Sequence, residues 1–154
     1  MIKNIELIIY DFDGVMTDNR VLVDENGKEA VFVNRGDGLA VAAIKKAGIE
    51  QVIISTEKNK VVTARANKLK IKVMQGVDDK RSLVLKYIRT KKIDPKKVIY
   101  VGNDINDLEA MKVVGWPVAP SDACEEVKKI AKTVLSKKGG YGVIRELFDL
   151  IKKG

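Results

Sequence analysis

The sequence contains no histidine and only one cysteine, Cys124, among its 154 residues. The lack of histidine excludes histidine-based catalytic triads, a histidine general base and histidine ligands to a metal. A single cysteine cannot form an intrachain disulfide or a multi-cysteine zinc site, and we interpret Cys124 as a small, unreactive residue on a helix. Any catalysis must therefore use carboxylates, lysines, hydroxyls or a hard metal ion.

Long hydrophobic runs are also missing, since the longest purely apolar stretches are short ones such as residues 7–9 and 52–54. A bilayer-spanning helix needs about 20 apolar residues, so we expect no membrane partner. The first six residues lack the apolar core of a signal peptide, which favours a cytoplasmic location. Apolar residues make up 45% of the chain and the mean hydropathy is −0.10, values typical of one globular domain over residues 1–154.

Aromatic residues make up only 5% of the chain, although its net charge is +8, with 29 Lys and Arg against 21 Asp and Glu. A basic surface of this kind can bind nucleic acid. The lysines are spread along the chain, however, and few aromatic side chains are present on which bases could stack. A solvated surface rich in Lys and Glu explains the charge as well, and we expect no nucleic-acid partner.

Short apolar runs alternate with longer segments of helical periodicity, which is typical of an α/β fold with a parallel sheet. We predict a doubly wound, Rossmann-like sheet between helices. An Asn-Gly hairpin insertion at about residues 20–33 interrupts the alternation after the first strand. Strands are predicted at residues 5–10, 52–54, 71–74, 98–101 and 116–118. Three helices are predicted at residues 39–47, 61–69 and 143–151. A further helix should follow a cap at Asp78, another should start near Asp104, and another should run from a cap at Ser121 or Asp122 to residue 131.

The most informative stretch, Asp11-Phe12-Asp13-Gly14, directly follows the first predicted strand. Residues two apart in an extended chain point to the same side, so Asp11 and Asp13 are expected to lie together at the carboxyl edge of the sheet. Two neighbouring carboxylates repel each other unless a cation or a shared proton compensates them. Gly14 permits a tight turn close to a ligand. Taken alone, the stretch is equally consistent with a solvated turn that closes the strand.

A second acidic cluster follows the strand at residues 98–101, where Asp104 and Asp107 are three residues apart at a helix start and share a face. Acidic residues also favour helix N-termini electrostatically, which is the simpler explanation. Two acidic strand ends in one parallel sheet can nevertheless converge. Such oxygen-rich clusters suit Mg²⁺, which retains water and accepts phosphate oxygens.

Two less specific signals, Ser55 and Lys80, lie between these clusters in the sequence. Ser55 follows the strand at residues 52–54, where a hydroxyl and nearby amides can hold a phosphate oxygen or simply cap a helix. Lys80, taken alone, is one surface lysine among many. It becomes a candidate site residue as part of the ordered set Asp-x-Asp, strand-end Ser, Lys and Asn-Asp-x-x-Asp.

This ordered set, which spans residues 7–107, resembles the four motifs of the haloacid dehalogenase-like phosphohydrolases. Matching stretches that reach residues 139–146 extend the resemblance to the 3-deoxy-D-manno-octulosonate 8-phosphate phosphatases and to the C-terminal domain of acylneuraminate cytidylyltransferases. The resemblance implies a Mg²⁺-dependent phosphomonoesterase that acts on a phosphorylated 2-keto-3-deoxy sugar acid. The positive net charge suits this substrate, which carries both a phosphate and a carboxylate.

The resemblance also implies a role for each matching residue. Asp11 would be the nucleophile that forms an aspartyl-phosphate, and Asp13 would protonate the leaving group and then deprotonate the attacking water. Mg²⁺ would be bound by the Asp11 carboxylate, the Asp13 main-chain carbonyl and Asp104. Ser55 and Lys80 would hold the phosphoryl oxygens. Asp107 would support the metal shell or position Lys80.

The substrate-binding residues implied by the resemblance depend on the branch of the family. Residues 55–59, Ser-Thr-Glu-Lys-Asn, are similar to the nonulosonate 9-phosphate and cytidylyltransferase branch, whereas octulosonate phosphatases have a Thr-Gly-Arg-like run there. In that branch Glu57 and Lys68 would lie near the sugar acid, beside Thr56. Arg35 is a further candidate for the substrate carboxylate. A solvated helix face is the alternative interpretation of Glu57 and Lys68, and both substrates stay open.

The resemblance further implies an assembly, because family members commonly insert a lid domain where this chain has only the hairpin and no large cap. A site without a lid is too open to sequester a substrate alone. In the related phosphatases a homotetramer solves this, with the hairpins forming a barrel and neighbouring subunits completing each site. The Gly-Gly-Tyr-Gly segment at residues 139–142 would then reach over the site, or it is only the loop before the last helix.

Two other functions share parts of this pattern. A non-catalytic assembly domain related to the cytidylyltransferase domain would be expected to lack Asp11 or Asp13, and both are present. A phospho-acceptor signalling receiver also uses Asp, Mg²⁺ and Lys, but its acceptor lies at a central strand after acidic residues at the first. Here Asp-x-Asp closes the first strand and no acceptor Asp follows residues 52–54, which counts against a receiver.

Overall fold

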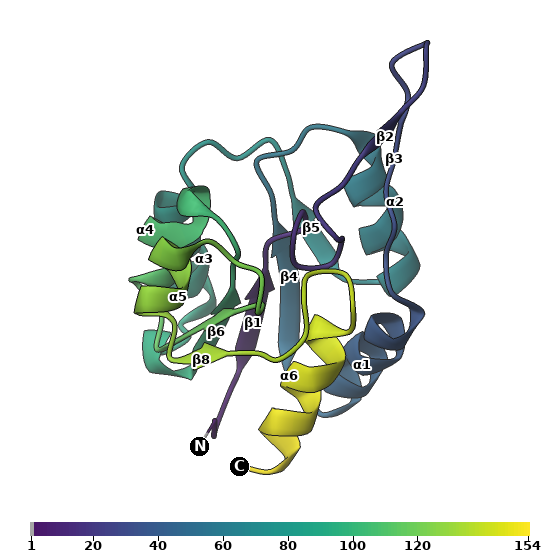
Figure 1. Cartoon of the computed structure of the whole chain (residues 1–154). Helices are drawn as coiled ribbons and strands as arrows, with labels where there is room; N and C mark the ends of the chain where they lie inside the picture. Colours follow the sequence, from purple (N-terminus) through teal and green to yellow (C-terminus); the bar gives the residue numbers. More distant parts are fainter. Residues whose placement is uncertain (1) are drawn as a thin grey trace.

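The computed structural model describes residues 2–154, and its centre is a sheet of parallel strands lying between helices (Figure 1). The strand order β5-β4-β1-β6-β7-β8 confirms the predicted doubly wound α/β fold. All five strand pairs in this sheet are parallel. The strands are β1 (Leu7–Tyr10), β4 (Glu50–Ile54), β5 (Lys72–Met74), β6 (Val98–Val101), β7 (Trp116–Ala119) and β8 (Thr133–Val134).

Helices cover both faces of the sheet, and the alternation of side chains along each strand explains why the central strands β1 and β6 are buried along their whole length. In β1, Ile8 and Tyr10 belong to the core on one face, whereas Leu7 and Ile9 belong to the core on the other. The first face is covered by α1 (Arg35–Lys46), α2 (Lys60–Leu69) and α6 (Val143–Lys152). The second is covered by α3 (Lys80–Lys91), α4 (Leu108–Met111) and α5 (Glu125–Ile130). None of the helices in residues 2–154 has the length and hydropathy of a membrane-spanning segment.

Strand β1 lies in the middle of the sheet, and this position determines where a site can form. It pairs with β4 on one side and β6 on the other, with Tyr10 opposite both Ile53 and Val101. The carboxyl ends of the three strands therefore meet at one edge of the sheet. Ligands of doubly wound folds bind outside such an edge.

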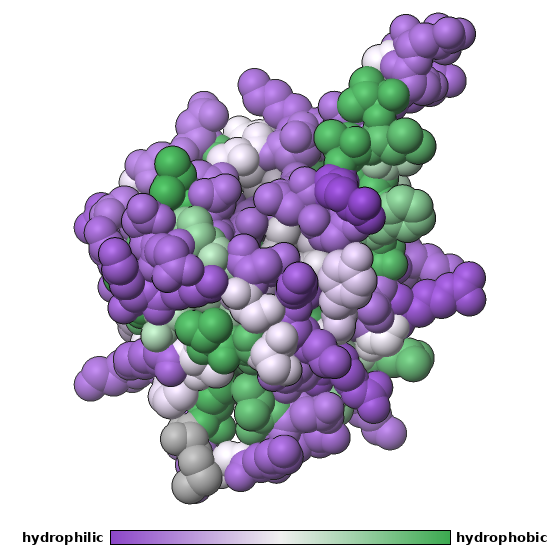
Figure 2. Space-filling model, in the orientation of Figure 1, coloured by the Kyte–Doolittle hydropathy of each residue, from purple (hydrophilic) through white to green (hydrophobic). Residues whose placement is uncertain are grey.

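The predicted Asn-Gly hairpin is present as β2 (Leu22–Val23) and β3 (Glu29–Ala30), which form a separate antiparallel pair. At its tip the Asp24 carboxylate accepts the N–H groups of Asn26 and Lys28 at 2.8 and 2.9 Å, and Gly27 adopts a φ of +75°. The hairpin projects from the body of the molecule, and apolar side chains gather along its stem (Figures 1 and 2). No large cap accompanies it in residues 2–154.

Several predicted helix starts were wrong. A helix begins after the residue whose side chain accepts the first free N–H groups, and the sequence offered more than one such residue. Helix α1 begins at Arg35 rather than Leu39, since the Asn34 side chain accepts the Gly36 N–H at 2.7 Å. The cap of α3 is Asp79, which accepts the N–H of the third helical residue, rather than Asp78.

The start of α5 and the strand β8 were also missed. Cys124 is the N-cap of α5 and makes no side-chain cap bond, so neither Ser121 nor Asp122 caps this helix. The Asp122 carboxylate instead accepts the Gly139 N–H at 2.9 Å. Strand β8 has only two residues, which is too short for an apolar pattern to show.

Candidate active site

The loop that follows β1 carries the first two candidate residues, Asp11 and Asp13. The Asp11 N–H donates to the Val101 carbonyl at 2.9 Å, which extends the pairing of β1 with β6 and fixes Asp11 at the sheet edge. Phe12 is fully buried in the core, and the two carboxylates on either side of it line one pocket of about 230 Å³. Gly14 turns the chain at a φ of +77°, and a side chain there would collide with Asn103. The structure thus brings Asp11 and Asp13 together.

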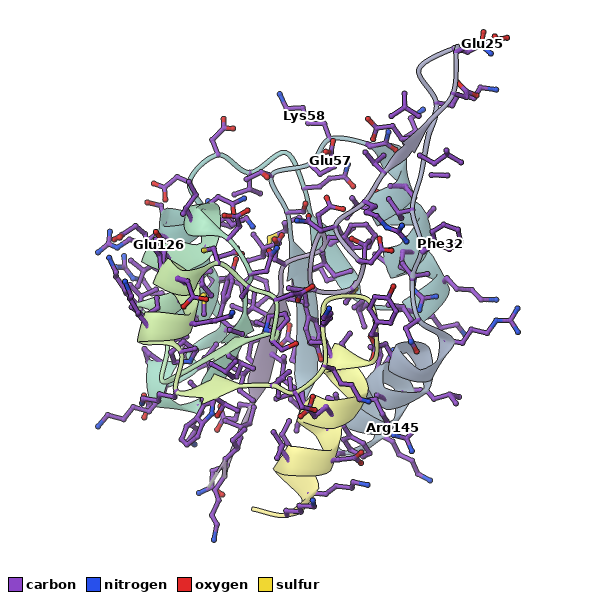
Figure 3. The ribbon with its side chains drawn as sticks, viewed as in Figure 1. Glu25, Phe32, Glu57, Lys58, Glu126 and Arg145 are labelled. Atoms are coloured by element: carbon purple, nitrogen blue, oxygen red, sulfur yellow. The ribbon has the colours of Figure 1, made fainter. Side chains whose placement is uncertain are left out.

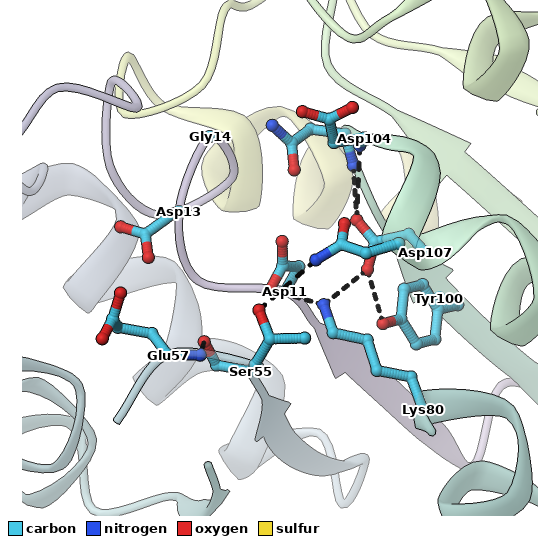
Figure 4. A network of polar contacts seen from close by, with 12 residues as sticks. Asp11, Asp13, Gly14, Ser55, Glu57, Lys80, Tyr100, Asp104 and Asp107 are labelled. Carbon is cyan, nitrogen blue, oxygen red and sulfur yellow. Dashed lines mark hydrogen bonds and ion pairs between the residues drawn. The ribbon is translucent and has the colours of Figure 1, made fainter. Parts of the chain in front are cut away.

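Lys80 joins the two acidic clusters in a buried network (Figure 4). It is the first residue of α3 and is only 2% exposed. Its ammonium group donates to Asp11 Oδ1 at 2.9 Å and to Asp107 Oδ1 at 2.7 Å. Both carboxylates are buried as well. The two acidic motifs of the sequence therefore meet through one lysine.

Asp107 holds this lysine and the loop after β6, rather than lining the pocket. Its Oδ1 also accepts the Tyr100 hydroxyl at 2.8 Å. Its Oδ2 accepts the backbone N–H groups of Asn103 at 2.9 Å and Asp104 at 3.4 Å. Asp107 thereby fixes both Lys80 and the backbone that carries the neighbouring pocket residues. Of the two roles expected for it, this geometry favours the positioning of Lys80.

Burial and mutual repulsion perturb the titration of the acidic residues. Burial, followed by the charge of Asp107, raises the pKa of Asp11 to about 7, although Lys80 opposes the shift. Burial would lower the pKa of Lys80, but Asp11 and Asp107 outweigh it, so that this pKa is raised. Burial and then the charge of Glu57 raise the pKa of Asp13. A carboxyl group with a raised pKa is suited to acid–base chemistry near neutral pH.

Ser55 and Thr56 reach the same pocket from the end of β4. Ser55 is 2% exposed and its Oγ accepts the Glu57 N–H at 3.1 Å. Thr56 is exposed, and its Oγ1 accepts the Asn106 amide at 3.4 Å. Glu57 lies on the loop between β4 and α2 and lines a second pocket of about 210 Å³ (Figure 3). This pocket adjoins the first, because both are lined by Asp13 and Asn19.

Asn103 begins the Asn-Asp-x-x-Asp motif, but no role was predicted for this pocket residue from the sequence. Its side chain lines the pocket beside Asp11, Asp13 and Asp104, and its Oδ1 is buried without a hydrogen-bond partner. Asp104 lines the pocket too, but it is exposed and its Oδ1 accepts the Ile105 N–H at 2.8 Å. The signal for Asn103 was its place directly after Gly102 at the end of β6. A preference for charged ligands pointed to Asp104 instead.

A divalent metal would need neutral oxygen ligands as well as carboxylates in this pocket. In the described part of the chain, no three acidic, cysteine or histidine side chains are grouped closely enough to hold a metal ion by themselves. The unpaired Asn103 Oδ1 and the main-chain carbonyl of Asp13 can complete such a set. A buried carbonyl oxygen that receives no hydrogen bond can be satisfied by a cation. The donor set is entirely oxygen and fits Mg²⁺.

Two predicted substrate residues do not reach either pocket within one chain. Arg35 is the exposed first residue of α1, and Lys68 is exposed in the last turn of α2. The start of α2 is next to the site, and Lys68 lies eight residues further along, about 12 Å at the usual helical rise. Neither residue lines the two adjoining pockets.

The glycine-rich segment packs against the loop of Asp11 and Asp13 in the same chain. The Gly140 N–H donates to the Val15 carbonyl at 3.0 Å, and Gly139 lies against Gly14 with no space for a side chain. Only Tyr141 of this segment is clearly exposed. Within the chain the segment therefore packs on the backbone of this loop and leads into α6.

This chain is similar to known proteins in both sequence and structure. The sequence model of the haloacid dehalogenase-like hydrolase family matches residues 39–147 of this chain. The 3-deoxy-D-manno-octulosonate 8-phosphate phosphatase KdsC of Yersinia pestis is 36% identical over 149 residues, which cover 96% of this chain and 80% of that protein. A putative HAD family hydrolase from Streptomyces avermitilis has a similar structure, with a TM-score of 0.94 and 47% identity over 96% of this chain and 85% of its own.

A solved relative with bound ligands is also similar. The 3-deoxy-D-manno-octulosonate 8-phosphate phosphatase of Moraxella catarrhalis was solved in complex with a magnesium ion, a phosphate ion and a KDO molecule. It matches with a TM-score of 0.94 and 31% identity, over 98% of this chain and 87% of its own.

Proposed function

Because this chain belongs to the haloacid dehalogenase-like hydrolase family and is a phosphoric monoester hydrolase, we propose that it hydrolyses a phosphorylated 2-keto-3-deoxy sugar acid. Octulosonate 8-phosphate and nonulosonate 9-phosphate are the two substrates that we consider. The observation that carries the proposal is Lys80, buried between Asp11 and Asp107 under a pocket that Asp13 also lines. Burying an ion pair offers little net stability, so a chemical role is the better explanation of this network.

The two carboxylates of the loop after β1 divide the chemistry between them. Asp11 attacks phosphorus and forms an aspartyl-phosphate, which splits one difficult hydrolysis into two steps. Asp13 gives a proton to the leaving oxygen and then takes one from the water that attacks the aspartyl-phosphate. The hydrogen bond from Lys80 fixes the Asp11 carboxylate, and its positive charge offsets the negative charge that develops on the phosphoryl group. Ser55 would hold a phosphoryl oxygen from the end of β4.

We assign Mg²⁺ to the pocket on the strength of its oxygen donors. When bound, the ion would neutralise charge on the phosphoryl group. Asp11, the main-chain carbonyl of Asp13 and Asp104 would hold it, and the unpaired Oδ1 of Asn103 would be a further ligand. Titration calorimetry with Mg²⁺ and no substrate tests the last residue. Asn103→Leu should weaken binding and Asn103→Asp should strengthen it, whereas equal affinities would remove Asn103 from the set.

The two adjoining pockets support an elongated substrate. A sugar phosphate with its phosphate beside Asp11 would extend past Asp13 into the second pocket, where the Glu57 carboxylate can accept hydroxyl groups. Thr56 would contact the substrate at the entrance. Arg35 and Lys68 could bind it only from a neighbouring subunit, since they lie away from the pockets of their own chain.

A homotetramer with shared sites would explain the exposed apolar side chains of the hairpin. Leu22 is 68% exposed and Phe32, labelled in Figure 3, is 74% exposed. Apolar side chains gather along this projecting element (Figure 2). Exposed apolar clusters of this kind are typical of association surfaces. We expect light scattering to give a tetramer for the wild type and a smaller species for Phe32→Ser. Val134→Ser, at an exposed position on β8, is the matched control, and a monomeric wild type would contradict the assembly.

Phosphate release from a panel of sugar phosphates tests the proposed function. The panel contains octulosonate 8-phosphate, nonulosonate 9-phosphates and simple hexose phosphates, with Mg²⁺ or with EDTA. We expect metal-dependent turnover that is lost in Asp11→Asn and kept in Asp149→Asn, a change on α6 at a side chain that is 43% exposed. The best substrate would identify the branch, and a preference for hexose phosphates would contradict a sugar-acid substrate.

The alternative is a non-catalytic assembly domain related to the C-terminal domain of acylneuraminate cytidylyltransferases. The exposed hairpin favours it as much as it favours the enzyme. A folded protein that binds Mg²⁺ and assembles, but releases no phosphate from any member of the panel, would support the assembly domain.

A further inference from the structure

Thr17 makes an unusual set of contacts with the loop that carries Asp13. It follows Asp13 by four residues and is fully buried. Its hydroxyl accepts the backbone N–H of Gly14 at 3.2 Å and that of Asn19 at 3.1 Å. The same hydroxyl lies 3.4 Å from Asp13 Oδ1. Thr17 is therefore connected both to the turn and to a candidate catalytic carboxyl group.

The valence of a hydroxyl group determines the direction of the last contact. A threonine hydroxyl has one hydrogen to donate and two lone pairs that can accept. The Gly14 and Asn19 N–H groups use the lone pairs, which leaves the hydrogen for Asp13 Oδ1. Oδ1 is then the accepting oxygen, and a proton carried by Asp13 is directed to Oδ2. Contacts of this kind are often long before substrate binds and shorten in the complex.

Thr17 is itself held from several sides, so its hydroxyl has a fixed position. Its backbone N–H donates to the Phe12 carbonyl at 3.2 Å, and it forms a β-bridge with Val33 at the foot of the hairpin. The glycine-rich segment at residues 139–142 packs against the backbone of Thr17. A Cβ at Gly139 would come within 2.9 Å of the Thr17 carbonyl oxygen, and one at Gly140 within 2.6 Å of its carbonyl carbon. Close packing of this backbone leaves the hydroxyl little freedom to move.

We propose that Thr17 is a positioning residue that orients the Asp13 carboxyl group for proton transfer to the leaving oxygen. This inference rests on the acid–base role proposed for Asp13. In the step concerned, a bond forms between an Asp11 oxygen and phosphorus, and the bond from phosphorus to the leaving oxygen breaks. The leaving oxygen keeps the electron pair and takes the proton from Asp13 Oδ2. Thr17 takes no part in the bond changes and acts only through Asp13.

The dependence of the rate on the leaving group separates positioning of an acid from general damage to the site. An alkyl phosphate such as a sugar phosphate needs a proton on its leaving oxygen, whereas p-nitrophenyl phosphate has a stable leaving group and needs little acid help. Thr17→Val keeps the shape of the side chain and removes the hydroxyl. The value of kcat/KM reports only steps up to the first irreversible one, so the later role of Asp13 as a base does not enter.

We expect Thr17→Val to lower kcat/KM for the best sugar phosphate by about 10- to 100-fold, a part of the 10²–10⁴ that general acid catalysis contributes. The loss of kcat/KM with p-nitrophenyl phosphate should be at least about fivefold smaller, because its leaving oxygen needs little protonation. Asp13→Asn should show the same dependence on the leaving group more strongly. Thr17→Ser keeps the hydroxyl and should restore the wild-type ratio of the two substrates.

Two outcomes would overturn the inference and can be told apart. Equal losses with both substrates in Thr17→Val, or a failure of Thr17→Ser to restore the ratio, would show that Thr17 serves only the fold. No dependence on the leaving group in Asp13→Asn would instead refute the acid role on which the inference depends. If Thr17→Val does not fold, Thr17→Ala removes the same hydroxyl without added bulk and gives the same comparison.

Discussion

Replacing Lys80 with methionine would remove the ammonium group between Asp11 and Asp107 while nearly keeping the length of the side chain. Lys80 is 2% exposed, and its partners are 5% and 0% exposed. Removing one partner of a buried ion pair costs about 3–5 kcal/mol, because the other charges stay buried without compensation. We therefore expect Lys80→Met to lower the free energy of unfolding at pH 8 by about 3–5 kcal/mol. Phosphatase turnover should fall by about 10²–10³-fold, as when a preorganised donor is lost.

The stability loss in Lys80→Met should shrink as the pH falls. The pKa of Lys80 is raised, so in the wild type the lysine stays charged between pH 5 and 8, folded or unfolded. Burial and Asp107 raise the pKa of Asp11 to about 7 with the lysine present, and this pKa rises further without it. Above about pH 4 the folded variant then binds more protons than its unfolded chain, and its stability decreases with rising pH.

Urea unfolding at pH 5 and pH 8 measures both effects. Lys86→Met changes an exposed lysine on the same helix and should alter stability by less than about 0.5 kcal/mol. The reasoning would be refuted if Lys80→Met stayed within about 0.5 kcal/mol of the wild type at pH 8 and still released phosphate.

Two further predictions concern residues outside the pocket. The Asp37 carboxylate accepts the Arg145 N–H at 2.9 Å at the start of α6, and burial raises its pKa, so its ionisation makes the fold less stable as the pH rises above about 4. In urea unfolding, Asp37→Asn should therefore gain stability relative to the wild type between pH 4 and pH 8, and a relative loss would contradict this. Gly139→Ala would place Cβ 2.1 Å from the Gly14 carbonyl oxygen, and we expect a loss of about 1–3 kcal/mol in thermal unfolding together with lower activity. Gly38→Ala, whose Cβ would meet only side chains at 3.5 Å, is the control that should be neutral or stabilising, and equal losses would disprove the close packing.

The central strands and the loop after β1 could be predicted from the sequence because their signals are local. An apolar run such as Leu7–Tyr10 is buried on both faces, and parallel pairing then places the residues that follow it at a shared edge. The meeting of the Asp-x-Asp loop, Lys80 and Asp107 follows from that topology and from the family resemblance. The exposed Asn-Gly hairpin likewise has a local sequence signal.

The rest of the site depends on contacts between distant parts of the chain, which no local pattern records. Gly139 packs on the backbone of Gly14, and the reason for a glycine at position 139 appears only when the two segments meet. The orphaned oxygen of Asn103 is visible only once its surroundings are known. Lys68 was expected near the sugar acid, but the length of α2 places it in the last turn, away from the pockets of its own chain.

The formation of a phosphoryl-enzyme at Asp11 is the claim that most directly decides the account. The measurement is acid quenching of the protein during turnover of a sugar-acid phosphate that carries labelled phosphorus, with Mg²⁺, followed by peptide mapping. We predict label on the peptide that contains Asp11, released by hydroxylamine as expected of an acyl phosphate, absent in Asp11→Asn and retained in Asp149→Asn. Phosphate release that continues in Asp11→Asn, with no label on the protein, would contradict the account.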